Sequence, residues 1–147
     1  MELFKKLLDY GEYLKEYPFH QNLGVSLEES DNLDKKVIKE TYFSVDPENK
    51  IPFPEEMDDL IRLHYLVTSR KVTTILEFGV GKSTIVFNHA LEQNKLKYGG
   101  FVNKNLRRSN PFECHSVDNN EEWIEVTKSA NPSIKNVTFH NCPCHVT

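Results

Sequence analysis

The strongest constraint on the fold is an apolar segment, residues 71–78 (KVTTILEF), that runs directly into a glycine turn. Its β-branched and apolar residues are typical of a buried strand, and residues 83–94 then predict a helix. Two further strands are predicted over 112–118 and 136–141, with a helix over 120–130 between them. An order of strand, helix, strand, helix, strand predicts an α/β fold with a parallel sheet and right-handed crossovers.

The first third of the chain has a different pattern. Apolar residues at helical spacing predict a first helix that stops before Pro18: Leu3, Phe4, Leu7, Leu8 and Leu14. Residues 35–46 have a strand-like composition. A second helix is predicted to open at Pro54, with five residues on one face: Met57, Leu60, Ile61, His64 and Val67. We interpret His64 as a core histidine rather than a catalytic one.

Composition excludes several classes of protein. The net charge of −4 argues against binding of nucleic acid through its phosphates. No apolar run approaches the roughly 20 residues that span a bilayer, and the charged N-terminus does not resemble a secretory signal. Three cysteines follow no secreted-scaffold spacing. We therefore expect a soluble, cytoplasmic protein with reduced thiols and neither nucleic-acid nor membrane partners.

Gly81-Lys82-Ser83-Thr84 has the last four letters of an ATP-binding P-loop. The motif G-x-x-x-x-G-K-[ST] needs its first glycine at position 76, which is Leu76, so the loop is too short. The alternative is a close turn between strand and helix, in which glycines let a ligand approach the main chain and the helix start receives an anion.

Three residues define this alternative turn, Glu77-x-Gly79-x-Gly81. The dinucleotide signature G-x-G-x-x-G is incomplete, because Thr84 occupies its third glycine position. The second predicted strand ends in Asp118, whose carboxylate can accept both hydroxyls of a ribose. Together these residues predict a site for a nucleoside-containing ligand.

The segments ILEFGVGKST and HSVDNNEEW resemble the first and second motifs of class I S-adenosylmethionine-dependent methyltransferases. The resemblance covers roughly residues 71–141. It implies a partial, three-layer Rossmann-like parallel sheet, preceded by a helical N-terminal segment. We therefore expect an N-terminal helical and irregular segment over residues 1–53 and an incomplete Rossmann-like cofactor-binding domain over 54–147.

By this resemblance, Gly79 and Gly81 approach S-adenosylmethionine and Glu77 orients its methionine end. Asp118 binds the ribose, and Asn119 lines the adenosine side. The carboxylate of the cofactor would be received at the start of the helix, by Ser83 and its neighbour Thr84. The cofactor carries no phosphate, so Lys82 needs no special role.

The chain departs from the family pattern in two ways. Gly81 and Asp118 are 37 residues apart, against the roughly 20 common in such units, and a basic insertion over 95–111 accounts for the excess. The family sheet has seven strands in the order 3-2-1-4-5-7-6, whereas this chain stops soon after the third. We expect a truncated version, with the strand at 71–78 left as an open edge that favours a homodimer.

His140, Cys142, Cys144 and His145 lie within six residues, HNCPCH. Their spacing differs from the C-x₂₋₄-C of common zinc sites, and Pro143 stiffens the turn between the thiols. We predict no metal site there; the resemblance instead places this loop near the adenine.

These patterns predict an S-adenosylmethionine-binding methyltransferase, or a fragment of one, that acts on a small-molecule acceptor. They assign no catalytic residue. Two alternatives stay open. One is a nucleotide-binding protein for ATP or NAD, because the same turn and acid serve either ligand. The other is a noncatalytic module in which a partial methyltransferase fold dimerises through its open edge.

Overall fold

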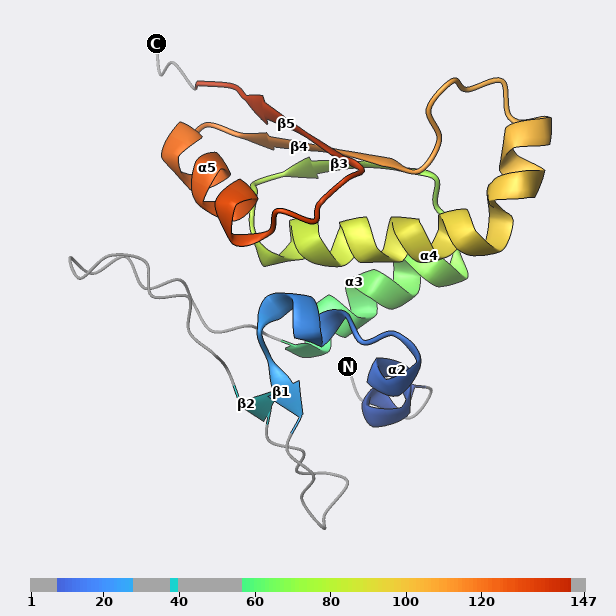
Figure 1. The fold of residues 1–147 in the computed structure, drawn as a ribbon, viewed down its shortest axis with the longest axis horizontal. Coiled ribbons are helices and arrows are strands. Elements are labelled where there is room, and N and C mark those ends of the chain that lie inside the picture. The colour runs from blue at the N-terminus through green and yellow to red at the C-terminus, as the bar shows by residue number, and fades with distance from the viewer. Residues whose placement is uncertain (1–7, 28–37, 40–56, 144–147) are drawn as a thin grey trace. The chain divides into compact units, whose positions relative to one another are not determined.

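The computed structural model describes residues 8–27, 38–39 and 57–143 (Figure 1). The chain forms two compact units, divided between Ile61 and Arg62 within helix α3 (Met57–Ser69). The boundary expected between residues 53 and 54 falls outside the described residues. No helix in the described ranges is long and apolar enough to cross a membrane.

The N-terminal unit is built from short elements. Helix α2 (Tyr10–Glu16) begins at Asp9, whose Oδ1 accepts the Glu12 N–H at 3.0 Å, and it ends before Pro18, as predicted. A 3₁₀ helix, η1 (Phe19–Leu23), follows and stops at Gly24, which has a φ of 71°. Strands β1 (Ser26–Leu27) and β2 (Ile38–Lys39) form an antiparallel pair.

Parts of the N-terminal prediction cannot be compared with the structure. Leu3, Phe4, Leu7 and Pro54 lie outside the described residues, and of the strand-like stretch 35–46 only the two residues of β2 lie within them. The prediction for α3 is confirmed, because all five residues expected on one face are buried: Met57, Leu60, Ile61, His64 and Val67.

The second unit contains the predicted parallel sheet. Strands β3 (Thr74–Phe78), β4 (Glu113–Asp118) and β5 (Val137–Asn141) lie in the order β3-β4-β5 and are all parallel. Helix α4 (Lys82–Asn105) connects β3 to β4, and α5 (Glu121–Ala130) connects β4 to β5. The predicted alternation of strands and helices is therefore confirmed.

The core of this unit lies between the sheet and the helices. Val67 of α3, Ala90 and Leu91 of α4, and Cys114 of β4 form one buried cluster. Burial raises the pKa of the Cys114 thiol to about 11, so the thiol is protonated at neutral pH and serves as a core side chain. The buried Asn94 donates two hydrogen bonds of 2.9 Å, to the carbonyls at positions 67 and 72, and so holds the connection between α3 and β3 against α4.

The expected three-layer arrangement is not found among the described residues. Helices α4 and α5 lie on the same side of the sheet (Figure 1), and on the opposite face Leu76 and Phe78 are 61% and 81% exposed. The strand at 71–78 is therefore buried on one face only. The reason is topological: β3, β4 and β5 advance across the sheet in one direction, so right-handed crossovers place both helices on one face.

The polar, glycine-containing composition of the insertion over residues 95–111 predicts a loop, and the structure corrects this prediction. Most of the insertion is helical, because α4 continues without interruption to Asn105. Gly99 and Gly100 favoured a loop, since each costs about 1 kcal/mol in a helix interior. The surrounding lysines and leucine are good helix formers, and the helix continues through both glycines. The connection to β4 is then short, from Leu106 to Phe112.

His64 is fully buried, and its Nε2 lies 2.8 Å from Nδ1 of His89 on α4. Burial, and then the charges of His89 and Lys97, lower the pKa of His64 to about 3. Burial also lowers the pKa of His89. The pair is therefore neutral in the folded protein at physiological pH, as the prediction of a core histidine requires.

Lowering the pH from 6.5 towards 3 is expected to reduce the free energy of unfolding. Over this interval the unfolded chain binds a proton at His64 that the folded protein does not bind. The residue contributes a slope of up to about 1.4 kcal/mol per pH unit. Urea unfolding across this pH range measures the slope, which should decrease in His64→Gln. The buried control Val86→Ala should lower stability evenly at every pH; an unchanged slope in His64→Gln would contradict the assignment.

Candidate functional site

The turn that joins β3 to α4 consists of three residues, Gly79, Val80 and Gly81. Gly79 has a φ of 93°, a conformation that favours glycine, and its N–H donates to the Val117 carbonyl at 2.8 Å. Gly81 is extended and caps α4, with its N–H donating to Thr84 Oγ1 at 3.0 Å. A Cβ added at either glycine would meet no atom within 4 Å, so there is room above this turn.

Glu77 lies on the covered face of β3 and is 7% exposed. Its carboxylate accepts three hydroxyl hydrogen bonds: from Ser83 at Oε1, and at Oε2 from Thr84 and Ser116, each at 2.7 Å. These contacts join β3 to the start of α4 and to the middle of β4. The side chains of Glu77 and Ser83 therefore bond to each other in the structure. Their expected contacts with a cofactor stay predictions.

Asp118 is the last residue of β4 and lies beside the glycine turn. Its Oδ2 accepts the Val80 N–H at 2.8 Å, and its Oδ1 accepts the Asn120 N–H at 2.9 Å. The indole N–H of Trp123 donates to the Val80 carbonyl at 2.6 Å. The N–H and the carbonyl of Val80 are thus bonded by Asp118 at the end of β4 and by Trp123 on α5. The predicted residue Asn119 is exposed next to Asp118.

The structure therefore brings Gly79, Gly81, Asp118 and Asn119 together at the carboxyl ends of β3 and β4. Each carboxylate oxygen has two lone pairs, and each Asp118 oxygen uses one on a backbone N–H. Two acceptor positions are left on this carboxylate, one on each oxygen. That number matches the two hydroxyls of a ribose.

Sequence reasoning missed two residues that support this site, Ser116 and Trp123, and it did not foresee that Thr84 bonds to Gly81 and Glu77. Thr84 sits at the third helical position, where a side chain commonly bonds back to the cap residue. The indole N–H of a tryptophan that packs against a sheet usually finds an acceptor, but the sequence does not show that the Val80 carbonyl is the acceptor of Trp123. Ser116 gives no local signal, because its partner Glu77 lies 39 residues away.

The HNCPCH stretch is only partly described. His140 belongs to β5 and Cys142 follows the strand, whereas Cys144 and His145 lie outside the described residues. Within the described ranges, no group of three or more His, Cys, Asp or Glu side chains is arranged to hold a metal ion.

Comparisons of the chain with protein-family models, with curated proteins and with solved structures found no match.

Glu77→Gln is expected to lower the free energy of unfolding by about 1–3 kcal/mol, because a buried acceptor of three hydrogen bonds is replaced by a group that also donates. Equilibrium unfolding in urea measures the loss. Glu125→Gln is the control, since its ion pair with Lys128 is exposed and is expected to contribute well under 1 kcal/mol. Equal stabilities of the two variants would show that the Glu77 contacts do not hold the turn.

Proposed function

We propose that this protein binds S-adenosylmethionine through a partial Rossmann-like sheet and belongs to a methyltransferase, whole or in part, that acts on a small-molecule acceptor. One observation carries the proposal. The carboxylate at the end of β4, Asp118, lies 2.8 Å from the Val80 N–H within the glycine turn that follows β3. An acid and an open glycine turn therefore share one edge of a parallel sheet, where open α/β sheets bind their ligands.

The chemistry of the cofactor suits these groups. Its ribose presents two hydroxyls, and the Asp118 carboxylate has two acceptor positions left. Its methionine carboxylate is an anion, which the start of α4 attracts through the helix dipole. Because it contains no phosphate, a three-residue turn suffices where a P-loop would need a longer one.

The buried contacts of Glu77 refine the proposal. Its three hydroxyl bonds make it a support for the turn, so the methionine end would meet backbone groups of Gly79, Gly81 and the helix start. The reaction would be an in-line attack of the acceptor on the sulfonium methyl group. Its rate would depend mainly on how well the two reactants are positioned, and no base is assigned.

Calorimetric titration of the purified protein with S-adenosylmethionine and S-adenosylhomocysteine tests this function. We expect micromolar binding in the wild type, weakened about 10- to 100-fold in Asp118→Asn, which loses charge-assisted hydrogen bonds to the ribose. Glu125→Gln on the exposed side of α5 is the matched control and should bind like the wild type.

Parallel titrations with Mg-ATP and NAD distinguish the nucleotide-binding alternative. Binding of either nucleotide, with none of the sulfur cofactor, would overturn the proposal in favour of that class. If none of these ligands binds, the methyltransferase proposal and the nucleotide-binding alternative are both overturned, and the noncatalytic module is the remaining candidate.

The exposed apolar side chains of β3 favour that noncatalytic module as a second candidate. Leu76 and Phe78 are 61% and 81% exposed, and β3 pairs only with β4 among the described strands. An apolar, proline-free edge strand readily pairs with a second chain. In this candidate two copies associate through their β3 edges and bring Phe78 into the interface.

Light scattering coupled to size-exclusion chromatography tests the association. The module is expected to elute as a dimer at tens of micromolar, and Phe78→Lys should convert it to a monomer, because a charge on an edge strand opposes pairing. Phe101→Lys is the control: Phe101 is 71% exposed but lies on α4. A wild-type monomer at every concentration tested would exclude this candidate.

A further inference from the structure

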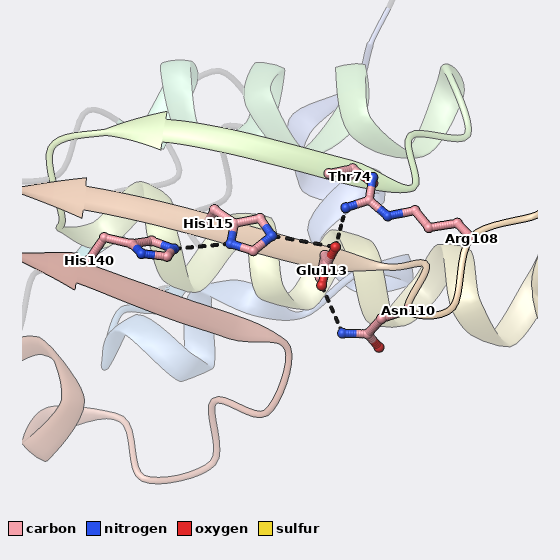
Figure 2. Close-up of polar contacts among 6 residues, drawn as sticks. All are labelled: Thr74, Arg108, Asn110, Glu113, His115 and His140. Atoms are coloured by element: carbon pink, nitrogen blue, oxygen red, sulfur yellow. Dashed lines mark hydrogen bonds and ion pairs between the residues drawn. The ribbon is translucent and has the colours of Figure 1, made fainter.

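The open face of the sheet carries a chain of polar contacts that the proposed function does not use (Figure 2). His115 on β4 lies at its centre: its Nδ1 is 3.1 Å from Nε2 of His140 on β5, and its Nε2 is 3.4 Å from the Glu113 carboxylate. Glu113 is itself held by Arg108 and by Asn110, whose amide donates to it at 2.7 Å. The two imidazoles therefore meet edge to edge across neighbouring strands.

The anchored carboxylate decides which nitrogen of His115 carries the proton. A carboxylate only accepts hydrogen bonds, so Glu113 favours the tautomer with hydrogen on Nε2. The lone pair of Nδ1 then points towards His140. A carboxylate behind an imidazole whose other nitrogen offers its lone pair is the arrangement that orients metal-ligating histidines.

The spacing of the two nitrogens also suits a metal ion. Two ligands at Zn–N distances of about 2.0–2.1 Å and tetrahedral angles lie about 3.3 Å apart, and square-planar ligands at a similar bond length lie about 2.9 Å apart. The observed separation of 3.1 Å falls between these values. A bound ion would therefore need to change the distance between the two nitrogens by only a few tenths of an ångström.

We propose that His115 Nδ1 and His140 Nε2 form a binding site for a borderline divalent cation, Cu²⁺ or Zn²⁺, with Glu113 as the positioning residue behind His115. Water completes the coordination, since the described residues offer no third side-chain ligand there. On binding, the proton of His140 moves from Nε2 to Nδ1 through solvent, which leaves the lone pair of Nε2 for the ion. Cu²⁺ binds more tightly than Zn²⁺, as expected for imidazole ligands.

Another histidine pair, on α3 and α4, shows why a metal site also needs to be accessible to solvent. His64 and His89 are 2.8 Å apart, a similar approach of two ring nitrogens. His64 is fully buried, however, so neither a hydrated cation nor its water ligands can enter there. His115, by contrast, has a side chain that is 32% exposed on the uncovered face of the sheet.

Titration of the full chain with Cu²⁺ and Zn²⁺, followed by calorimetry and by electron paramagnetic resonance for Cu²⁺, tests the site. We expect one equivalent of Cu²⁺ with two coordinated nitrogens, and at least a tenfold loss of affinity in His115→Asn and in His140→Asn. Glu113→Gln keeps both ligands and should weaken binding about 10- to 100-fold. Cys142→Ser is the control and should bind as the wild type does.

Three results would overturn the proposal: no stoichiometric binding by the wild type, binding that survives both histidine substitutions, or binding that is lost in Cys142→Ser and retained in His140→Asn. The last result would assign the ion to the cysteine-containing end of the chain. Circular dichroism of each variant verifies that the fold is retained, and Glu113→Gln tests the geometry without removing a ligand.

Discussion

The second unit depends on one buried carboxylate. Glu77 accepts hydrogen bonds from Ser83, Thr84 and Ser116, so a single side chain joins β3, the first turn of α4 and the neighbouring strand β4. A buried charge is costly unless it is hydrogen-bonded, and three hydroxyl donors supply the compensation. The glycine turn lies between these anchored points, and its conformation follows from them.

The direction in which the strands advance has a second consequence. Because β3, β4 and β5 follow one another across the sheet, both crossover helices cover the same face, and Leu76 and Phe78 remain on the other. Ligands of open α/β sheets bind where the connections change from one face to the other. Among the described strands the sheet ends at β3, so in the proposed function the glycine turn and Asp118 would form one side of such a crevice.

The order of strands and helices in this unit was predictable because hydrophobic periodicity is a local property, as in the strand that ends at Phe78 and the helix that follows. The length of α4 was not, because Gly99 and Gly100 are loop signals whose cost the rest of the helix outweighs. Contacts between residues far apart in the chain could not be predicted from the sequence either. His115 and His140 are 25 residues apart, and only the register of β4 with β5 brings them together.

The two faces of the sheet use acidic residues in opposite ways. On the covered face, three hydroxyl groups donate hydrogen bonds to Glu77, so its carboxylate stabilises the turn and faces the interior of the unit. On the open face, Arg108 and Asn110 hold Glu113 so that one oxygen faces an imidazole, and its charge is directed towards a ring that solvent can reach. Asp118 combines a structural contact with remaining acceptor capacity, because each of its oxygens accepts one backbone N–H and has one acceptor position left. In the proposed function, recognition of a ribose therefore falls to Asp118 rather than to Glu77, although both acids end or nearly end a strand at the same edge.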